Sequence, residues 1–220
     1  MARKIKPSKP LIYVFWEGES EECYAKFLKQ EFEDVASIKL ASKKGLFDEA
    51  KSCFDKSPTY KNYIDVTNEI WFFFDVEESD QQHWDDRFKI IQRLRKLKKK
   101  PGIRVRLLMT TGCIEYWFML HYRFLSPNLT TKPEKDRMEE MVRNKMPRYA
   151  KGDWDTISKI AMLYPEAMKN GKKTLENLRA DGLPTLDDTD ERNRWLHQSS
   201  RTFTTVQEAI EFLEGLQKNS

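Results

Sequence analysis

The chain has 220 residues, of which 39% are hydrophobic, and this is enough to bury one good core. Its 39 basic and 35 acidic side chains leave a formal net charge of only +4, which does not by itself indicate nucleic-acid binding. The three cysteines, Cys23, Cys53 and Cys113, are widely spaced and odd in number, which argues against a disulfide framework or a zinc site and favours a reducing, cytoplasmic location.

Residues 1–10 hold four Lys or Arg and two Pro, so we expect them to form a flexible basic leader. The apolar run that follows, LIYVFW at residues 11–16, is too short for a signal peptide or a membrane span, and no later run approaches that length. We therefore expect no membrane association. The run predicts instead a strand buried on both faces, which ends abruptly at Glu17 and Gly18.

A helix is predicted directly after Gly18, because Tyr24, Phe27 and Leu28 recur at helical spacing. Ser20 is interpreted as its N-cap rather than as a nucleophile. Acidic residues crowd its first turn, where the helix dipole favours negative charge.

The stretch EIWFFFDVEESD at residues 69–80 is the centre of the prediction. Its unbroken apolar run fits a strand buried on both faces, and the run stops at Asp75. In open α/β sheets ligands bind at the carboxyl edge of the strands, so the acids lie where a site is expected. Asp75 and Glu77 are two residues apart, point the same way in an extended chain and can share a cation. The alternative is an acidic turn that ends a core strand and caps the next helix.

The other elements follow from periodicity and turn signals. Strands are predicted near residues 35–40 and 103–109, and helices near 47–54, 81–100 and 113–124. This alternation predicts an α/β layered domain with a mainly parallel central sheet and right-handed crossovers over residues 11–125. The composition changes after that point, and residues 126–220 are expected to form a small helical C-terminal region packed on the sheet domain, with helices near 134–145, 156–167, 167–180 and 205–216 and a polar loop at 182–192.

Two basic segments are candidates for contact with a phosphate backbone. The first, RLRKLKKK at residues 93–100, ends a predicted helix, where a solvated basic end is the competing interpretation. The second surrounds Tyr149 and Lys151, where a solvated linker is equally consistent with the sequence.

The acids near the ends of the predicted strands suggest metal chemistry. Glu17 after one strand and the pair Asp75 and Glu77 after another suit Mg²⁺ or Mn²⁺, which take oxygen ligands and relieve repulsion between carboxylates. Such a centre would support phosphoryl transfer. Glu115 lies in an apolar helix and needs a partner, so it is expected to face the acids or a Lys or Arg. His121 is interpreted first as a core histidine, with substrate contact or proton transfer as the alternative.

Three motifs resemble one protein family. EGESEECYAKFL resembles the E-G-x-[ST]-E-x-x-Y element of the RloB-like, or abortive-infection AbiLii-like, proteins, and FFFDVEE resembles their V-x-D-x-D element. TTGCIEYWFMLHY is similar in register to their S-N-P-x-F-E-x-W-L-L-L-H-F, keeping Glu115, Trp117 and His121. A weaker similarity at RTFTTVQEAIEFL resembles the T-x-V helix near the end of the family's sequence.

This resemblance implies a Toprim-like fold, in which a Glu and a D-x-D motif serve magnesium-dependent phosphodiester chemistry. On that basis Glu17 would be the general acid/base or a ligand, and Asp75 and Glu77 would be the metal pair. Three further residues of the matched motifs would support these ligands or contact the substrate: Glu21, Glu115 and His121. The resemblance also implies phage defence, often with a partner ATPase, and the sequence leaves open a homo-oligomer.

Two departures from the family pattern bear on activity. Glu77 stands where the motif has an aspartate, and 110–112 reads Thr-Thr-Gly where it has Ser-Asn-Pro. The leading hypothesis is therefore a Mg²⁺-dependent endonuclease of bacterial antiphage defence acting on DNA or RNA. The alternative is a catalytically degenerate Toprim-like subunit that senses a phage component or partners an ATPase, and a third hypothesis is a nucleotide-binding regulatory domain.

Overall fold

A computed structural model describes residues 9–219, so most of the predicted basic leader lies outside the described residues. The strands are β1 (Leu11–Trp16), β2 (Ser37–Leu40), β3 (Thr67–Val76) and β4 (Arg104–Thr111). They form one sheet in the order β2-β1-β3-β4, and every pairing is parallel. The predicted α/β class with a parallel central sheet is therefore confirmed.

Helices alternate with these strands and then continue alone. Between and just after the strands lie α1 (Glu19–Glu31), α2 (Phe47–Lys56), α3 (Pro58–Lys61), α4 (Trp84–Arg95) and α5 (Ile114–Leu120), with the 3-10 turns η1 (Ile64–Val66) and η2 (Glu78–His83). The helical C-terminal part contains α6 (Lys132–Lys145), α7 (Trp154–Ala161), α8 (Tyr164–Leu178), η3 (Arg179–Asp181), α9 (Asp190–Gln198) and α10 (Gln207–Lys218). The division at residues 125 and 126 into two regions stays a prediction.

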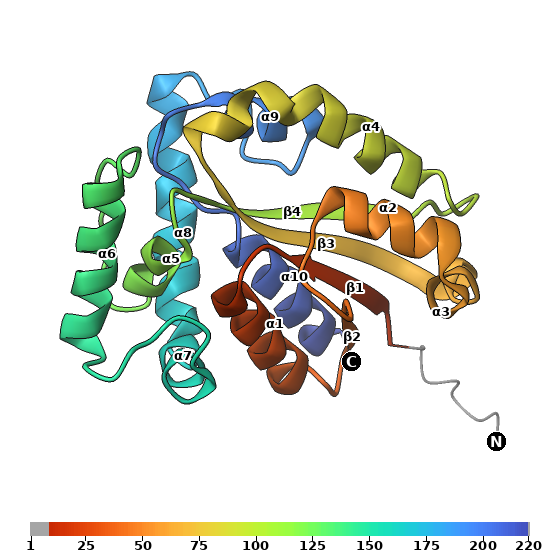
Figure 1. Ribbon diagram of the computed structural model, residues 1–220, viewed down its shortest axis with the longest axis horizontal. Coiled ribbons are helices and arrows are strands. Elements are labelled where there is room, and N and C mark those ends of the chain that lie inside the picture. Colours follow the sequence, from red (N-terminus) through yellow and green to blue (C-terminus); the bar gives the residue numbers. More distant parts are fainter. Residues whose placement is uncertain (1–8, 220) are drawn as a thin grey trace.

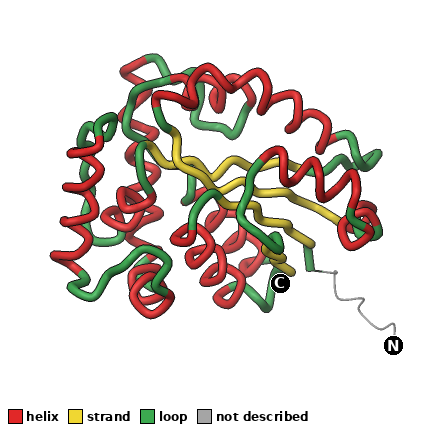
Figure 2. The backbone as a smooth tube through the Cα atoms, in the orientation of Figure 1, coloured by secondary structure: helices red, strands yellow, loops and turns green. Residues whose placement is uncertain are grey.

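The sheet lies in the middle of the molecule with helices on both sides (Figure 2). Figure 1 shows α2, α4 and α9 over one face and α1 and α10 over the other. The carboxyl ends of the strands point toward the group formed by α5, α6, α7 and α8 (Figure 1). A ligand at the carboxyl edge would therefore lie between the sheet and this helical group.

The central strand β3 is buried on both faces, as its apolar run predicts. On one face, Phe72 and Phe74 pack against Phe47 of α2, with ring centroids 4.2 and 5.5 Å apart. On the other face, Trp71 contacts Phe212 of α10 at 6.3 Å. Burying such large side chains on both faces contributes roughly 1.5–3 kcal/mol each and fixes the depth at which the strand ends.

Several predicted boundaries were wrong. Gly18 is the N-cap of α1, while the Ser20 hydroxyl accepts a hydrogen bond from the Gly152 backbone N at 3.1 Å. The helix predicted over 81–100 is α4 preceded by η2, so its basic end is helical only as far as Arg95, and α5 is shorter than predicted. The predicted polar loop at 182–192 overlaps the start of α9. This helix begins with polar residues only, so the sequence shows no helical spacing of apolar residues there.

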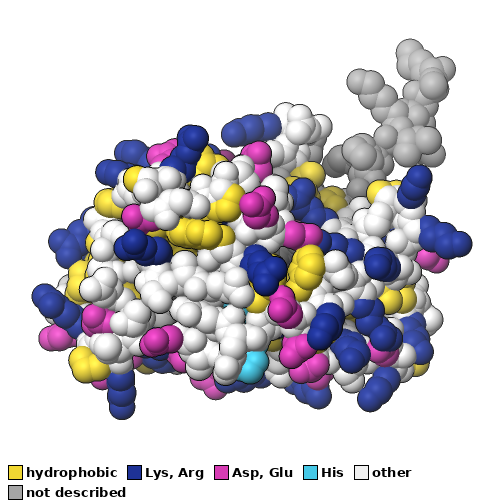
Figure 3. All heavy atoms as spheres, turned by 90° about the horizontal axis from the view of Figure 1, so that it is seen from above, with side chains coloured by type: hydrophobic (Ala, Val, Ile, Leu, Met, Phe, Trp, Pro, Cys, Tyr) yellow, Lys and Arg dark blue, Asp and Glu magenta, His cyan; other side chains and the backbone are white. Residues whose placement is uncertain are grey.

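The basic segment at residues 93–100 begins in the last turn of α4 and lies at the amino edge of the sheet, because β4 begins at Arg104 just beyond it. Figure 3 shows Lys and Arg gathered with some Asp and Glu on the side where α4 ends. Arg93 pairs with Asp55 at 2.6 Å, and Arg95 pairs with Asp190 at 2.8 Å. These ion pairs favour the interpretation of a solvated basic end, remote from the carboxyl edge.

The C-terminal part covers the outer edge of β4. The Thr111 backbone N donates to the Phe203 carbonyl at 3.1 Å, and the Thr205 N donates to the Met109 carbonyl at 2.9 Å. Thr110 and Thr204 form an antiparallel bridge. An uncovered edge strand invites association with other chains, and these contacts cover the carboxyl-terminal half of β4 within the molecule.

Gly112 ends this strand in a conformation that other residues rarely adopt. Its φ is +76°, and a Cβ at this position would lie 2.4 Å from the Leu129 carbonyl oxygen. Proline, with φ fixed near −65°, cannot take this conformation. The Thr110–Thr111–Gly112 turn therefore differs in backbone geometry from a turn that holds proline at this position.

We expect Gly112→Ala to lower the free energy of unfolding by at least about 2 kcal/mol, because it adds left-handed strain and a backbone clash. Gly215→Ala is the matched control: Gly215 is inside α10, and its added Cβ would meet no atom within 4 Å. The control should be neutral or stabilising by about 0.5–1 kcal/mol. Urea unfolding measures both; an unchanged midpoint for Gly112→Ala would contradict the account of this turn.

Candidate functional site

The predicted acids converge at the carboxyl edge of β1 and β3. These two strands are parallel neighbours in register from Ile12 with Glu69 to Trp16 with Phe73. Glu17 follows β1 directly, and its carboxylate Oε2 accepts a hydrogen bond from the Asp75 backbone N at 3.1 Å. The pairing of two buried strands therefore fixes the separation of the first two acids.

Glu21 joins them from the first turn of α1. Its side chain is only 4% exposed and folds back over Gly18, where a Cβ would lie 2.6 Å from Glu21 Oε2. Because Gly18 has no side chain, the Glu21 carboxylate can occupy the space above it. Burial, followed by repulsion from Glu17 and Glu115, raises the pKa of Glu21 to about 7.

Asp75 lies at the centre of the acids. Its Oδ1 is buried and has no hydrogen-bond partner. Burial raises the pKa of Asp75 well above its usual range, and four neighbouring carboxylates raise it further, namely those of Glu21, Glu17, Glu115 and Glu77. Glu17, Glu21, Asp75, Glu77 and Glu115 are called the acid cluster below.

Glu115 enters from the first turn of α5 and is 1% exposed. The Tyr149 hydroxyl donates to its Oε1 at 2.8 Å, and Lys151 Nζ lies 3.4 Å from the same oxygen. The sequence predicted that Glu115 faces either the other acids or a Lys or Arg. In the structure it faces both the acids and a lysine. Tyr149 is buried and is not available to stack on a base.

Glu77 is the outermost acid of the cluster. It is the N-cap of η2, its side chain is 49% exposed, and its Oε1 lies 2.5 Å from Lys135 Nζ on α6. Its backbone N donates to Asp80, whose carboxylate also forms an ion pair with Arg87. Glu77 therefore lies beside Asp75 but points toward a lysine.

The acid cluster offers the right ligand atoms for a hard divalent cation, although they are not gathered around one point. Among residues 9–219, no group of three or more His, Cys, Asp or Glu side chains is arranged to hold a metal ion. The unpartnered Oδ1 of Asp75 is nevertheless the kind of oxygen that a cation would satisfy. To bind the cation, Glu77 would have to leave Lys135. The ligand atoms therefore suit a divalent cation, and the Glu77 side chain must move before they can surround it.

His121 is not brought to the acid cluster. Its Nδ1 lies 2.9 Å from the Trp117 carbonyl oxygen, and its Nε2 lies 3.1 Å from the Tyr24 hydroxyl. Nδ1 therefore carries the proton, and Nε2 accepts from Tyr24. Burial lowers the pKa of His121 to about 3. This is the arrangement of a core histidine with neither ring nitrogen free for a substrate.

The sequence did not place four further side chains in the surroundings of the acid cluster: Asp80, Arg87, Lys135 and Lys151. Asp80 had a local signal, because an acid three residues after Glu77 can complete a capping box. Lys135 and Lys151 lie far along the chain in segments whose charges are mixed, so nothing in the sequence pairs them with particular acids.

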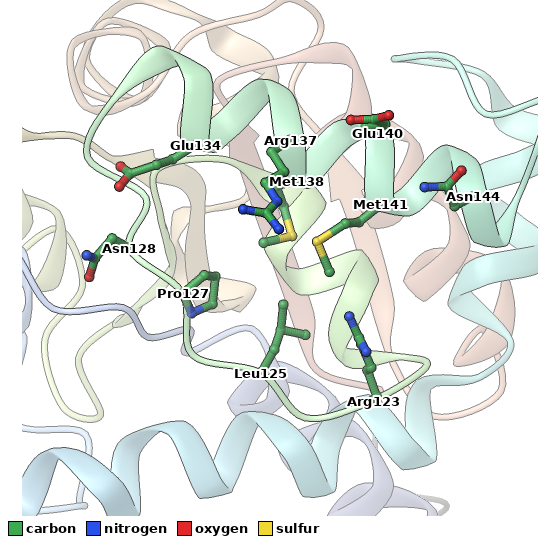
Figure 4. Close-up of a pocket in the computed structure, with 10 residues that line it drawn as sticks. All are labelled: Arg123, Leu125, Pro127, Asn128, Glu134, Arg137, Met138, Glu140, Met141 and Asn144. Atoms are coloured by element: carbon green, nitrogen blue, oxygen red, sulfur yellow. The ribbon is translucent and has the colours of Figure 1, made fainter.

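A separate hollow of about 600 Å³ lies between α6 and the chain after α5. Figure 4 shows Met138 and Met141 pointing from α6 toward Leu125, with Arg123 and Arg137 also lining the space. None of the acid cluster lines it.

No helix within the described part of the chain is long and apolar enough to cross a membrane.

Comparison with known families matches residues 12–213 to the family described as RloB-like protein. The match covers more than nine-tenths of the chain and includes all three motifs that carry the resemblance. No curated protein and no solved structure matches the chain.

The raised pKa values predict how stability depends on pH. An unfolded Glu releases its proton near pH 4, whereas folded Glu21 retains it up to about pH 7. The stabilisation from this retained proton is full below about pH 4 and is lost as the pH rises through 7. At about 1.4 kcal/mol for each pKa unit, the loss is on the order of 3–4 kcal/mol.

We expect Glu21→Gln to remove this part of the decrease in unfolding free energy between pH 4 and 7.5, measured by urea unfolding in EDTA. The control is Glu22→Gln, which removes an acid that pairs with Lys26 at the surface. If Glu21→Gln leaves the pH profile of the wild type intact, the assigned environment of Glu21 is wrong.

Proposed function

Since the chain belongs to the RloB-like family, we propose that it is a divalent-metal-dependent nuclease that hydrolyses phosphodiester bonds of DNA or RNA in bacterial antiphage defence. The observation that carries the proposal is the acid cluster around the unpartnered Oδ1 of Asp75. Buried like charges are costly, and a bound cation relieves that cost.

Each acid has a distinct part in the proposed site. Glu17, Asp75 and Glu77 would hold Mg²⁺ or Mn²⁺, which when bound would polarise a phosphoryl oxygen and lower the pKa of a water. Glu17 is oriented by its hydrogen bond from the Asp75 backbone. Glu21 can hold or release a proton near neutral pH, which is the requirement for a general acid or base.

Tyr149 and Lys151 would position Glu115, the innermost acid of the site. Their contacts fix Glu115 and partly compensate its charge, so Glu115 would act as a support for the ligands. Lys135 forms an ion pair with Glu77, and releasing it would leave an ammonium next to the substrate phosphate.

The motif resemblance supports the finer parts of the proposal. E-G-x-S-E with the later D-x-E pair supports a Toprim-like arrangement, and the similarity to AbiLii-like proteins supports phage defence with an ATPase as partner. The parallel sheet and the location of the acids at its carboxyl edge are consistent with that arrangement. We further propose cytoplasmic action, and the homo-oligomer stays a prediction.

A specific observation favours a second candidate, a catalytically degenerate subunit that recognises a phage component or partners an ATPase. Glu77 replaces the motif's aspartate and is engaged by Lys135, and Gly112 gives the neighbouring turn a left-handed backbone. Both departures lie at the proposed site.

Cleavage assays test the nuclease directly. With Mg²⁺ or Mn²⁺, the purified protein should cleave single- or double-stranded DNA or RNA, and Asp75→Asn and Glu17→Gln should each reduce the rate at least about 100-fold, because each removes a charged ligand. Glu78→Gln removes an exposed acid next to Glu77 and should retain activity. Folded Asp75→Asn and Glu17→Gln proteins with wild-type activity would overturn the site assignment.

Calorimetric titration with Mn²⁺ distinguishes the two candidates. The nuclease predicts binding to the wild type that Asp75→Asn abolishes, and stronger binding to Lys135→Gln, because that variant frees Glu77. A degenerate subunit predicts no binding that depends on Asp75.

A further inference from the structure

Arg87 provides a cation beside the acid cluster that the proposed metal chemistry does not use. It lies in the first turn and a half of α4. Burial raises the pKa of Glu17, and the positive charge of Arg87 offsets part of this rise. Its guanidinium forms an ion pair with Asp80, and its Nη1 lies 2.6 Å from His197 Nε2.

The guanidinium is held in place without any ligand. Its central carbon lies 5.4 Å from the ring centroids of both Phe47 and Phe74. The side chain is only 18% exposed. Two rings, a carboxylate and an imidazole therefore fix its orientation, so little conformational entropy would be lost when a ligand binds.

Three of the five N–H groups of Arg87 have no acceptor among the described residues, because Asp80 and His197 each accept one. His197 is uncharged at neutral pH, since burial and then the charge of Arg87 lower its pKa to about 4. It therefore accepts from Arg87 without adding a second positive charge. The remaining donors are available to an anion.

A cavity of about 520 Å³ is lined by Arg87 together with Lys44, Gly45 and His83. Lys44 has no carboxylate partner among residues 9–219. The Gly45 backbone N donates to the Trp16 carbonyl at 3.1 Å, so this wall adjoins the residue before Glu17. One wall of the cavity is therefore bonded to the end of β1, directly before Glu17 of the acid cluster.

Three carboxylates also line the cavity, and two of them are compensated. Glu49 pairs with Lys43 at 3.0 Å, and Asp86 pairs with Lys89 at 2.8 Å, while Asp48 has no such partner. Among the described residues, the ammonium of Lys44 and the free N–H groups of Arg87 are therefore the donors of this cavity that no carboxylate occupies.

We propose that this cavity between α2 and α4 binds a phosphate group of the nucleic-acid backbone through Arg87 and Lys44. A guanidinium fork and an ammonium are the groups that recognise phosphate oxygens. The inference rests on the proposed function for its substrate, and it places this phosphate beside the one that Glu17, Asp75 and Glu77 would act on. Cations at this position would offset the repulsion between the acid cluster and a polyanion.

Binding in EDTA tests the proposal without requiring cleavage. The probes are inorganic pyrophosphate, followed by calorimetry, and a fluorescent single-stranded DNA 12-mer, followed by anisotropy. Arg87→Lys keeps the charge but loses the fork and should weaken both at least about tenfold. Lys44→Gln, an exposed substitution that should not disturb folding, should weaken both by about threefold to fivefold. Arg93→Gln on the same helix is the control and should bind as the wild type does.

The inference is overturned if the wild type binds neither probe, if Lys44→Gln and a folded Arg87→Lys both bind as tightly as the wild type, or if Arg93→Gln loses as much affinity. Failure of the proposed function is distinguishable. Arg87-dependent binding without cleavage would refute the nuclease alone, whereas cleavage with an unchanged KM in both cavity variants would refute the phosphate site alone.

Discussion

Repulsion within the acid cluster, where Glu21 and Glu115 are buried and Glu17 and Glu77 reach the surface, is the constraint on which the rest of this structure depends. The parallel pairing of β1 with β3 brings Glu17 to Asp75, and the first turns of α1 and α5 add Glu21 and Glu115. No one of these elements can move away, because each is fixed by a core that fills both faces of the sheet. The protein therefore keeps unfavourable charge at one edge, as expected of a site maintained for function rather than for stability.

The surrounding structure relieves this repulsion in three ways. Protons remain on acids whose pKa values are raised, as at Glu21 and Asp75. Lysines approach the outer acids, with Lys135 at Glu77 and Lys151 at Glu115. The positive charge of Arg87 lowers the pKa of Glu17 in part against the effect of burial. In each case a proton or a protein cation provides positive charge of the kind that a divalent cation would provide in the proposed active state.

Much of this was predictable, because local composition determined it. The apolar run before Asp75 identifies a strand buried on both faces, and its abrupt end identifies the edge where the acids lie. The cations were not predictable, since Lys135 and Lys151 reach the acids from segments 58 and 36 positions further along the chain than Glu77 and Glu115. Local rules also failed where tertiary contacts prevailed: Ser20 bonds to Gly152 instead of capping α1.

The central claim, that the acid cluster binds a divalent cation, is tested most directly by diffraction from crystals soaked in Mn²⁺. The account predicts an anomalous difference peak within ligand distance of Asp75 Oδ1, about 2.0–2.6 Å, with Glu77 turned from Lys135 toward the ion and Glu17 as a further ligand. The absence of a peak at saturating Mn²⁺, or a peak only at surface acids remote from Asp75, would contradict it.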